Sequence, residues 1–154
     1  MNAPTFPVPP SGLFEGALHL FPVRVYYEDT DLSGMVYHAN YLRWFERARS
    51  DLLGLLGIDQ RAAAEAGEGT FTVAELSIRY IAPARLDDAV TIATCATELG
   101  AASVRLRQRA TRGDHLLADA SVRVGFISPE GRPRRQPSAW RAAFESLQSA
   151  KDAA

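Results

Sequence analysis

The period of the apolar positions changes along the chain and divides it into strands and helices. Phe21, Val23, Val25 and Tyr27 occupy every second position. Side chains alternate across a strand, so this period of two predicts a strand with one apolar face. In residues 40–56 the apolar positions are instead three and four apart, which predicts one long amphipathic helix.

Residues at both ends of the predicted helix favour the same boundaries. Asn40 is a residue type that caps a helix N-terminus, and Gly57 is suited to end the helix. A second, short helix is expected over residues 59–66, because Gly67 follows it. The apolar face of the long helix comprises Tyr41, Phe45, Ala48, Leu52 and Leu55.

The second half of the chain predicts four strands and a terminal helix. The first of these strands, over residues 71–80, changes its apolar parity near Val73–Ala74, which indicates a β-bulge or sharp bend. A terminal helix begins near Ser138 and carries apolar residues on one side. The other three predicted strands, in which apolar residues occupy alternate positions, cover residues 90–96, 104–109 and 116–126.

These elements predict an α+β fold. Strands joined by short turns pair antiparallel, and a single long helix covers only one face of the resulting five-stranded sheet. The other face and the free edges of the sheet would expose apolar surface and unpaired backbone groups. We therefore expect a homodimer or homotetramer.

Composition indicates a chain without a strongly charged character. It has 154 residues, of which 47% are hydrophobic, and a formal net charge of −1. This balance favours neither nucleic acid nor an anionic membrane as a partner. No apolar run reaches the roughly 18 residues of a membrane-spanning helix. The single cysteine, Cys95, suits a reducing compartment, so we expect a cytoplasmic location.

The N-terminus differs from the rest of the chain in its proline content. Four prolines fall within residues 1–12. Each proline fixes φ and removes a backbone donor, which disfavours regular structure. We therefore expect residues 1–19 to form a flexible arm before a single domain over residues 20–150.

A polar loop separates the first strand from the long helix and carries the residues best suited to chemistry. Asp29 and Asp31 follow the strand, and His38 lies seven residues beyond Asp31 at the helix entrance. One interpretation is a solvated turn whose acidic side chains favour the helix dipole. The other is a catalytic loop, because free N–H groups at a helix N-terminus can stabilise a developing oxyanion.

Contiguous motifs in and around this loop resemble a known family. Val23–Asp31, Gly34–Tyr41 and Phe45–Arg49 resemble the hydroxybenzoyl-CoA thioesterase family of hot-dog proteins. Within that family the resemblance is greatest to the Tol-Pal-associated acyl-CoA thioesterase branch, and Ile78–Asp88 is similar to a second segment of that branch. The resemblance covers about residues 20–135. It implies a hot-dog fold, in which an antiparallel five-stranded sheet wraps around a long central helix.

The resemblance also implies an activity and the residues that perform it. The protein would be an acyl-CoA thioesterase with Asp31 as the catalytic nucleophile or general base. The backbone N–H of His38 would polarise the thioester carbonyl, and the His38 side chain would assist. A thioester is already a good electrophile with a good leaving group, so neither a metal nor a cofactor is needed. The substrate would bind at Gly34, Val36, Tyr37, Asn40 and Tyr41.

Alternatives to this assignment stay open. A hot-dog domain can bind or sense acyl-CoA without hydrolysing it, although a carboxylate beside the thioester favours an enzyme. A hot-dog dehydratase acting on acyl carrier protein is a third, less similar class. Glu46 projects from the long helix and could supply a carboxylate, but with Asp31 present we assign it a structural role. Leu32 stands where the branch commonly has small residues, so the preferred acyl group stays open.

Two other groups of side chains bear on ligands. His19, His38 and His115 show no spacing typical of metal ligands. The second group is Arg105, Arg107 and Arg109, which share one face of a predicted strand. Their guanidinium groups could bind the phosphates of coenzyme A or form salt bridges between subunits.

Overall fold

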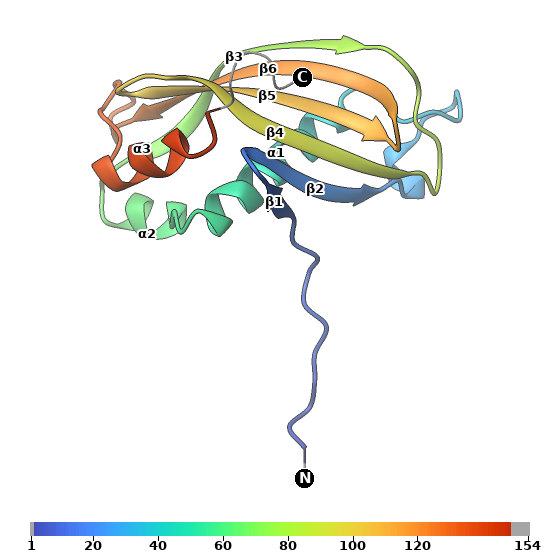
Figure 1. Cartoon of the computed structure of the whole chain (residues 1–154), viewed down its shortest axis with the longest axis horizontal. Helices are drawn as coiled ribbons and strands as arrows, with labels where there is room; N and C mark the ends of the chain where they lie inside the picture. Colours follow the sequence, from blue (N-terminus) through green and yellow to red (C-terminus); the bar gives the residue numbers. More distant parts are fainter. Residues whose placement is uncertain (1, 149–154) are drawn as a thin grey trace.

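The computed structural model describes residues 2–148, which form one antiparallel six-stranded sheet and three α-helices (Figure 1). None of these helices combines the length and apolar character needed to cross a bilayer. The helices are α1 (Asn40–Leu55), α2 (Gln60–Glu65) and α3 (Ser138–Glu145), and a 3₁₀ turn, η1, spans Tyr27–Asp29. In sheet order, the strands are β1 (Leu13–Glu15), β2 (Leu18–Arg24), β4 (Ala89–Leu99), β5 (Ser103–Arg112), β6 (His115–Ile127) and β3 (Thr70–Tyr80).

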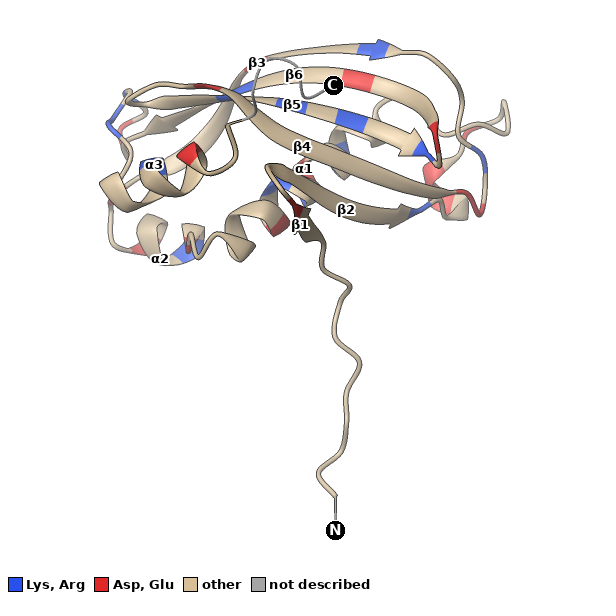
Figure 2. Cartoon of the chain, viewed as in Figure 1, with Lys and Arg blue, Asp and Glu red and all other residues tan. Residues whose placement is uncertain are grey.

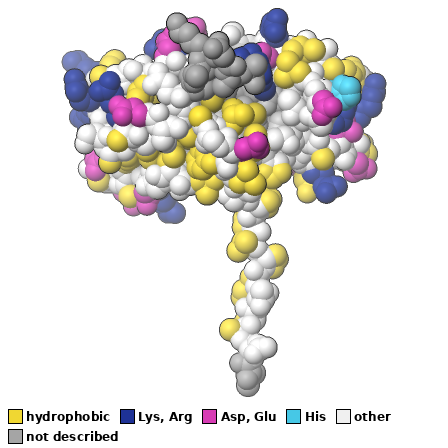
Figure 3. All heavy atoms as spheres, in the orientation of Figure 1, with side chains coloured by type: hydrophobic (Ala, Val, Ile, Leu, Met, Phe, Trp, Pro, Cys, Tyr) yellow, Lys and Arg dark blue, Asp and Glu magenta, His cyan; other side chains and the backbone are white. Residues whose placement is uncertain are grey.

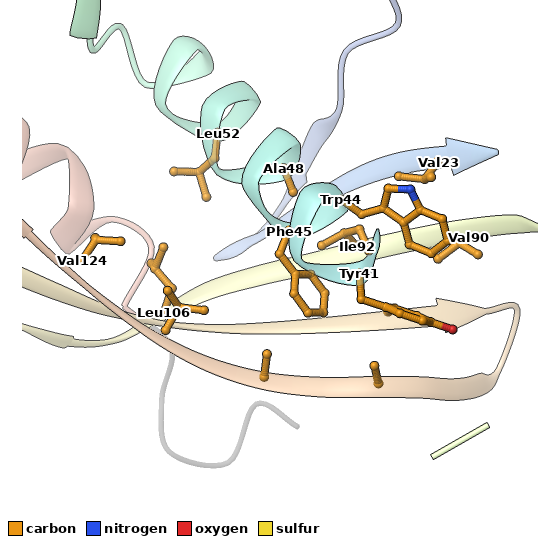
Figure 4. Close-up of a cluster of buried hydrophobic side chains, with 14 of the residues drawn as sticks. Val23, Tyr41, Trp44, Phe45, Ala48, Leu52, Val90, Ile92, Leu106 and Val124 are labelled. Atoms are coloured by element: carbon orange, nitrogen blue, oxygen red, sulfur yellow. The ribbon is translucent and has the colours of Figure 1, made fainter. Parts of the chain in front are cut away.

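The predicted long helix and its packing against a sheet are confirmed. The curved sheet wraps around α1, so that its inner face covers one side of the helix (Figure 1). Trp44, Phe45 and Leu52 are almost completely buried. They lie in one cluster with Ile92 of β4 and Leu106 of β5 (Figure 4). Fully burying a large apolar side chain contributes roughly 1.5–3 kcal/mol, so this cluster stabilises the α+β architecture.

The ends of α1 differ from the prediction in two details. Ala39 rather than Asn40 is the N-cap, and no side chain caps the helix. The Asn40 side-chain amide instead donates a hydrogen bond of 2.8 Å to the backbone oxygen of Asp29. Leu55, expected on the buried face, is the last residue of α1 and is 45% exposed. Gly57 follows with a φ of 78°, as expected of a residue that ends a helix.

Two local predictions from turn and parity signals are confirmed. The short second helix exists, and Asp59 caps it by accepting a hydrogen bond of 2.9 Å from the Ala62 N–H. The register between β3 and β6 shifts between Val73 and Glu75, which is the predicted bulge. β3 forms one edge of the sheet, and its side chains are mostly exposed.

The N-terminal segment contains more structure than predicted. β1 and the start of β2 lie within the expected arm of residues 1–19, and they form a hairpin whose turn contains Gly16 with a φ of 60°. The boundary predicted at residue 19 is therefore wrong. β1 adds a sixth strand to the five that were expected. The predicted end of the domain at residue 150 lies outside the described residues.

Asp51 on α1 anchors this segment. Its carboxylate accepts hydrogen bonds from the Ser11 hydroxyl (2.7 Å) and the Gly12 N–H (2.9 Å) and lies 2.7 Å from Nε2 of His19. Partial burial raises the pKa of Asp51, but these hydrogen bonds outweigh that effect and lower the pKa below its ordinary value. Residues 2–10 extend away from the domain (Figure 1, Figure 3).

β5 and β6 carry several charged residues (Figure 2). These alternate with buried residues, so their side chains lie on the face of the sheet away from the core. Arg107 donates two hydrogen bonds, of 3.0 and 3.3 Å, to the Asp119 carboxylate and so lowers the pKa of Asp119. Arg105 lies 3.7 Å from Glu75 and 3.6 Å from Glu98. These salt bridges form within one chain, whereas one of the two interpretations from the sequence placed salt bridges of these arginines between subunits.

Candidate active site

Asp29 ties the loop between η1 and α1 together. Its carboxylate accepts a hydrogen bond of 2.8 Å from the Tyr26 N–H. Its backbone oxygen accepts two more, both of 2.8 Å, from the Tyr37 N–H and the Asn40 side-chain amide. Asp29 is also buried. The first aspartate of the loop therefore has a structural role, because it fixes the loop against the start of α1.

Asp31 lies on the exposed part of the same loop. Its backbone closes a tight turn, since the Gly34 N–H donates to the Asp31 carbonyl and the Asp31 N–H donates to the Met35 carbonyl, both at 3.0 Å. Gly34 has a φ of 79°, a conformation that residues with a Cβ rarely adopt. The structural task of Gly34 is therefore to shape the turn that presents Asp31.

The Asp31 carboxylate is held in its ionised form. Its Oδ1 accepts hydrogen bonds from the Ser33 hydroxyl and from the Ser33 N–H, the latter at 2.8 Å. The Ser33 hydroxyl lowers the pKa of Asp31 most, the Ser33 N–H adds to this effect, and the nearby His38 lowers the pKa further. Asp31 is therefore a carboxylate at neutral pH, able to act as a nucleophile or a base.

His38 lies where the loop enters α1. Within residues 2–148, its backbone N–H takes part in no hydrogen bond, so this donor is available to a ligand. The N-cap, Ala39, has no side chain that could satisfy the first turn of α1. The positive end of the helix dipole therefore lies close to the free His38 N–H.

A pocket of about 260 Å³ opens beside His38. Of the predicted site residues, Val36, His38 and Tyr41 line it. Its wall is mostly apolar, which suits an apolar ligand group oriented by a few polar atoms. The other lining residues are Met35, Tyr80, Ile81, Ala82 and Pro83.

The remaining predicted residues lie outside the wall of this pocket. Tyr37 is 45% exposed, and its ring centroid is 4.6 Å from that of His38. Asn40 is buried, with its amide bonded to the Asp29 carbonyl. The structure thus brings Asp31 and His38 together on one loop and places Asn40 behind it, in contact with the protein.

One part of the pocket has no counterpart among the predicted site residues. Residues 80–83, at the end of β3 and just after it, form much of the wall. The following chain holds the loop in place, because the Val36 N–H donates a hydrogen bond of 2.9 Å to the Ala84 carbonyl. The only sequence feature that could have indicated residues 80–83 is the resemblance of Ile78–Asp88 to the second family segment. That resemblance on its own assigns them no role.

Comparison with known proteins identifies the family to which the chain belongs. Residues 33–118 match the family described as the thioesterase superfamily. The chain belongs to this superfamily. The protein is therefore a thioester hydrolase, and the family resemblance carried by its loop and helix motifs is confirmed.

Individual relatives match almost over their full length. The acyl-CoA thioesterase YbgC of Haemophilus influenzae is 41% identical over 128 residues, covering 82% of this chain and 94% of that protein. The acyl-CoA thioester hydrolase YbgC of Escherichia coli O6:H1 is 40% identical over 130 residues, covering 83% and 96%. A solved structure of a probable thioesterase from Bartonella henselae has a TM-score of 0.75 and 39% identity, covering 78% and 99%. These likenesses confirm the predicted hot-dog fold.

Proposed function

We propose that the protein hydrolyses acyl-CoA to a free acid and coenzyme A, using Asp31 and the backbone N–H of His38. One observation carries this proposal. The loop that enters α1 carries the ionised carboxylate of Asp31 and the free N–H of His38, and His38 lines an apolar pocket. Curated relatives of similar length are named acyl-CoA thioesterases, which supports the substrate. Because acyl-CoA is a cytoplasmic metabolite, we also place the protein in the cytoplasm.

The proposed reaction uses these two groups in succession. The thioester carbonyl oxygen accepts a hydrogen bond from the His38 N–H, and the N-terminus of α1 stabilises its developing negative charge. Asp31 then acts in one of two ways. It attacks the carbonyl carbon and expels the thiolate, forming an anhydride that water hydrolyses, or it takes a proton from the attacking water. Both routes start from the ionised carboxylate that the lowered pKa of Asp31 favours.

The other loop residues have supporting roles in this proposal. The His38 imidazole lies close enough to Asp31 to lower its pKa and would orient the carboxylate or the water. Val36 and Tyr41 line the pocket and would contact the acyl group. Tyr37, which is exposed beside His38, would contact the substrate nearer the pocket entrance.

We also propose that the active form is a homodimer or homotetramer. β3 is an edge strand of 11 residues, whereas β1 at the opposite edge has only 3. A long exposed edge with apolar side chains favours pairing with another chain, and Val73, Tyr80 and Ile81 are 46%, 47% and 50% exposed. Because residues 80–83 line the pocket, pairing there would place each site at a subunit boundary. A monomer in light scattering at micromolar concentration would contradict this proposal.

Thiol release from a panel of aromatic, short-chain and long-chain acyl-CoAs tests the proposed reaction. Wild-type protein should hydrolyse at least one ester, and Asp31→Asn should lower turnover about a thousandfold or more. Its melting temperature and its affinity for a non-hydrolysable thioether analogue should be nearly unchanged. The matched control is Glu28→Gln, which removes an exposed negative charge from η1, directly before the loop, and should leave turnover within about twofold.

Two outcomes would contradict the proposal. Activity of Asp31→Asn within about tenfold of wild type would remove this carboxylate from the mechanism. Wild-type protein that binds every acyl-CoA of the panel but releases thiol from none would favour the alternative, a non-catalytic acyl-CoA binding module.

A further inference from the structure

The carbonyl of His38 receives its hydrogen bond from a side chain 42 residues further along the chain. Tyr80, the last residue of β3, donates its hydroxyl to the His38 backbone oxygen at 2.8 Å. We propose that Tyr80 is a positioning residue, which holds the His38 backbone so that its N–H points at the thioester carbonyl. This inference rests on the proposed function of the His38 N–H as the oxyanion donor.

Hydrogen bonds fix the backbone on both sides of the His38 Cα. The Tyr37 carbonyl shares a peptide plane with the His38 N–H, and it accepts a hydrogen bond of 2.9 Å from the Asn40 N–H. The His38 carbonyl belongs to the next peptide plane, which Tyr80 holds. Because each peptide unit is planar, the first of these hydrogen bonds holds the plane that contains the His38 N–H. The second holds the plane on the other side of the His38 Cα, which could otherwise turn about φ and ψ and shift the first plane. Without the Tyr80 hydroxyl, only one of the two planes is held.

Side chains next to His38 in the sequence cannot replace this hydrogen bond. Ala39 has no polar side chain, and the Asn40 amide is already bonded to the Asp29 carbonyl. A carbonyl without a protein partner would bond to water and would vary in direction. Partial burial raises the pKa of Tyr80, so its hydroxyl stays protonated and able to donate at neutral pH.

The ring of Tyr80 is itself positioned by aromatic neighbours. Its centroid lies 6.1 Å from that of His38 and 5.6 Å from that of Tyr41, both at steep interplanar angles of 88° and 73°. Tyr41 is buried and contacts Trp44 of the core, with centroids 5.0 Å apart. Such edge-to-face contacts connect the ring to the rigid part of α1. Removing the hydroxyl alone should therefore leave the ring in place.

Tyr80→Phe isolates the hydrogen bond to His38, because it keeps the ring and removes only the hydroxyl. We expect kcat for thiol release to fall about tenfold, the effect of losing one well-placed hydrogen bond. KM and melting temperature should stay nearly unchanged. At an assay temperature well below the melting temperature, the loss of a merely structural contact would not lower kcat. Tyr27→Phe is the matched control. Tyr27 is 82% exposed, and its hydroxyl has no partner within the described residues, so kcat should not change.

Hydrogen exchange provides a readout that does not depend on activity. The segment covering residues 37–41 should exchange faster in Tyr80→Phe and at the wild-type rate in Tyr27→Phe. If Tyr80→Phe keeps wild-type kcat while Asp31→Asn is inactive, the positioning role is wrong and the proposed function stands. If Asp31→Asn keeps its activity, the proposed function itself fails, and with it the inference about Tyr80.

Discussion

Two aspartate–histidine pairs lie along α1, and their surroundings are opposite. Asp31 and His38, at the N-terminal end, are both exposed, and no hydrogen bond joins their side chains in the part of the chain that the structure describes. Further along the helix, Asp51 lies 2.7 Å from Nε2 of the fully buried His19. Yet both aspartates have a lowered pKa. A lowered pKa by itself therefore does not distinguish an active site from a structural contact.

The pairs differ in which polar atoms stay available. Both oxygens of Asp51 are bonded to protein groups, and those bonds connect β2 and the end of the arm to α1. The hydrogen bonds to Asp31 reach only Oδ1, and the His38 N–H beside the pocket has no protein partner within residues 2–148. The proposed site thus keeps an unused carboxylate oxygen, and an unused N–H donor beside a pocket. In the structural pair both carboxylate oxygens are bonded, and the one ring nitrogen of His19 without a partner among the described residues, Nδ1, is buried.

Replacing His38 should disturb the exposed pair most strongly. Proline removes the backbone N–H, so His38→Pro should lower turnover about 10²–10³-fold, as loss of one oxyanion donor does. Alanine keeps the N–H, and His38→Ala should lose less than the roughly 10²-fold typical of a general acid–base group. Turnover against pH and melting curves for both variants provide the measurement. An alanine variant as inactive as Asp31→Asn would instead make the imidazole and the carboxylate joint catalysts.

Replacing Asp51 should give the reverse result, a loss of stability without a loss of activity. Asp51→Ala removes three hydrogen-bonding contacts, so it should lower the free energy of unfolding in urea by about 1–3 kcal/mol and leave turnover at 25 °C within about twofold. Asp114→Ala, in an exposed turn, is the control and should change neither quantity. Equal stability of Asp51→Ala and wild type would show that the buried pair contributes nothing.

The stabilisation from Asp51 should also depend on pH. Its folded-state pKa is lowered, so its contribution is complete above the ordinary aspartate pKa and is lost as the pH falls through the folded value. The difference between wild type and Asp51→Ala should therefore narrow in acid. Urea denaturation at a series of pH values measures it, and a difference that widens in acid would contradict the assignment.

Truncations of the N-terminal arm test which of its residues stabilise the protein through their contacts with Asp51. Deleting residues 2–10 removes no described hydrogen bond and should leave the melting temperature unchanged. Deleting residues 2–12 also removes the two bonds from Ser11 and Gly12 to Asp51. Losing both bonds should lower the free energy of unfolding by about 1 kcal/mol in total, and so lower the melting temperature by about 2–4 °C. Calorimetry of both truncations measures the difference, and identical melting temperatures would show that these bonds add no stability.

Features that depend on neighbouring residues could be predicted from the sequence. The period of apolar positions over residues 40–56 was enough for α1, because a helix repeats its contacts every three or four residues. The parity change at Val73 was enough for the bulge of β3. The loop that contains Asp31 is a contiguous motif, so its family could be identified without knowledge of the fold.

Features that depend on distant residues could not be predicted in this way. His19 was assigned to the arm because nothing near it in sequence indicates that Asp51 lies beside it. Asn40 is a residue type that commonly caps helices, but its side-chain amide donates to the Asp29 carbonyl instead. Tyr80 reaches His38 only because β3 ends beside the start of α1. In each case a partner from another element decides the role, and the sequence pattern does not contain that partner.

The smallest predicted effect concerns the hydroxyl that holds Asp31. Ser33→Ala removes the hydrogen bond that lowers the pKa of Asp31 most, so this pKa should rise toward its ordinary value. Because the proposed reaction requires the ionised carboxylate, the acid limb of kcat/KM should move to higher pH. Activity at a pH well above the Asp31 pKa of both wild type and variant should stay unchanged. Ser11→Ala removes the corresponding serine hydrogen bond from Asp51 and should leave the profile in place. A profile that moves in Ser11→Ala rather than in Ser33→Ala would reverse the roles of the two pairs.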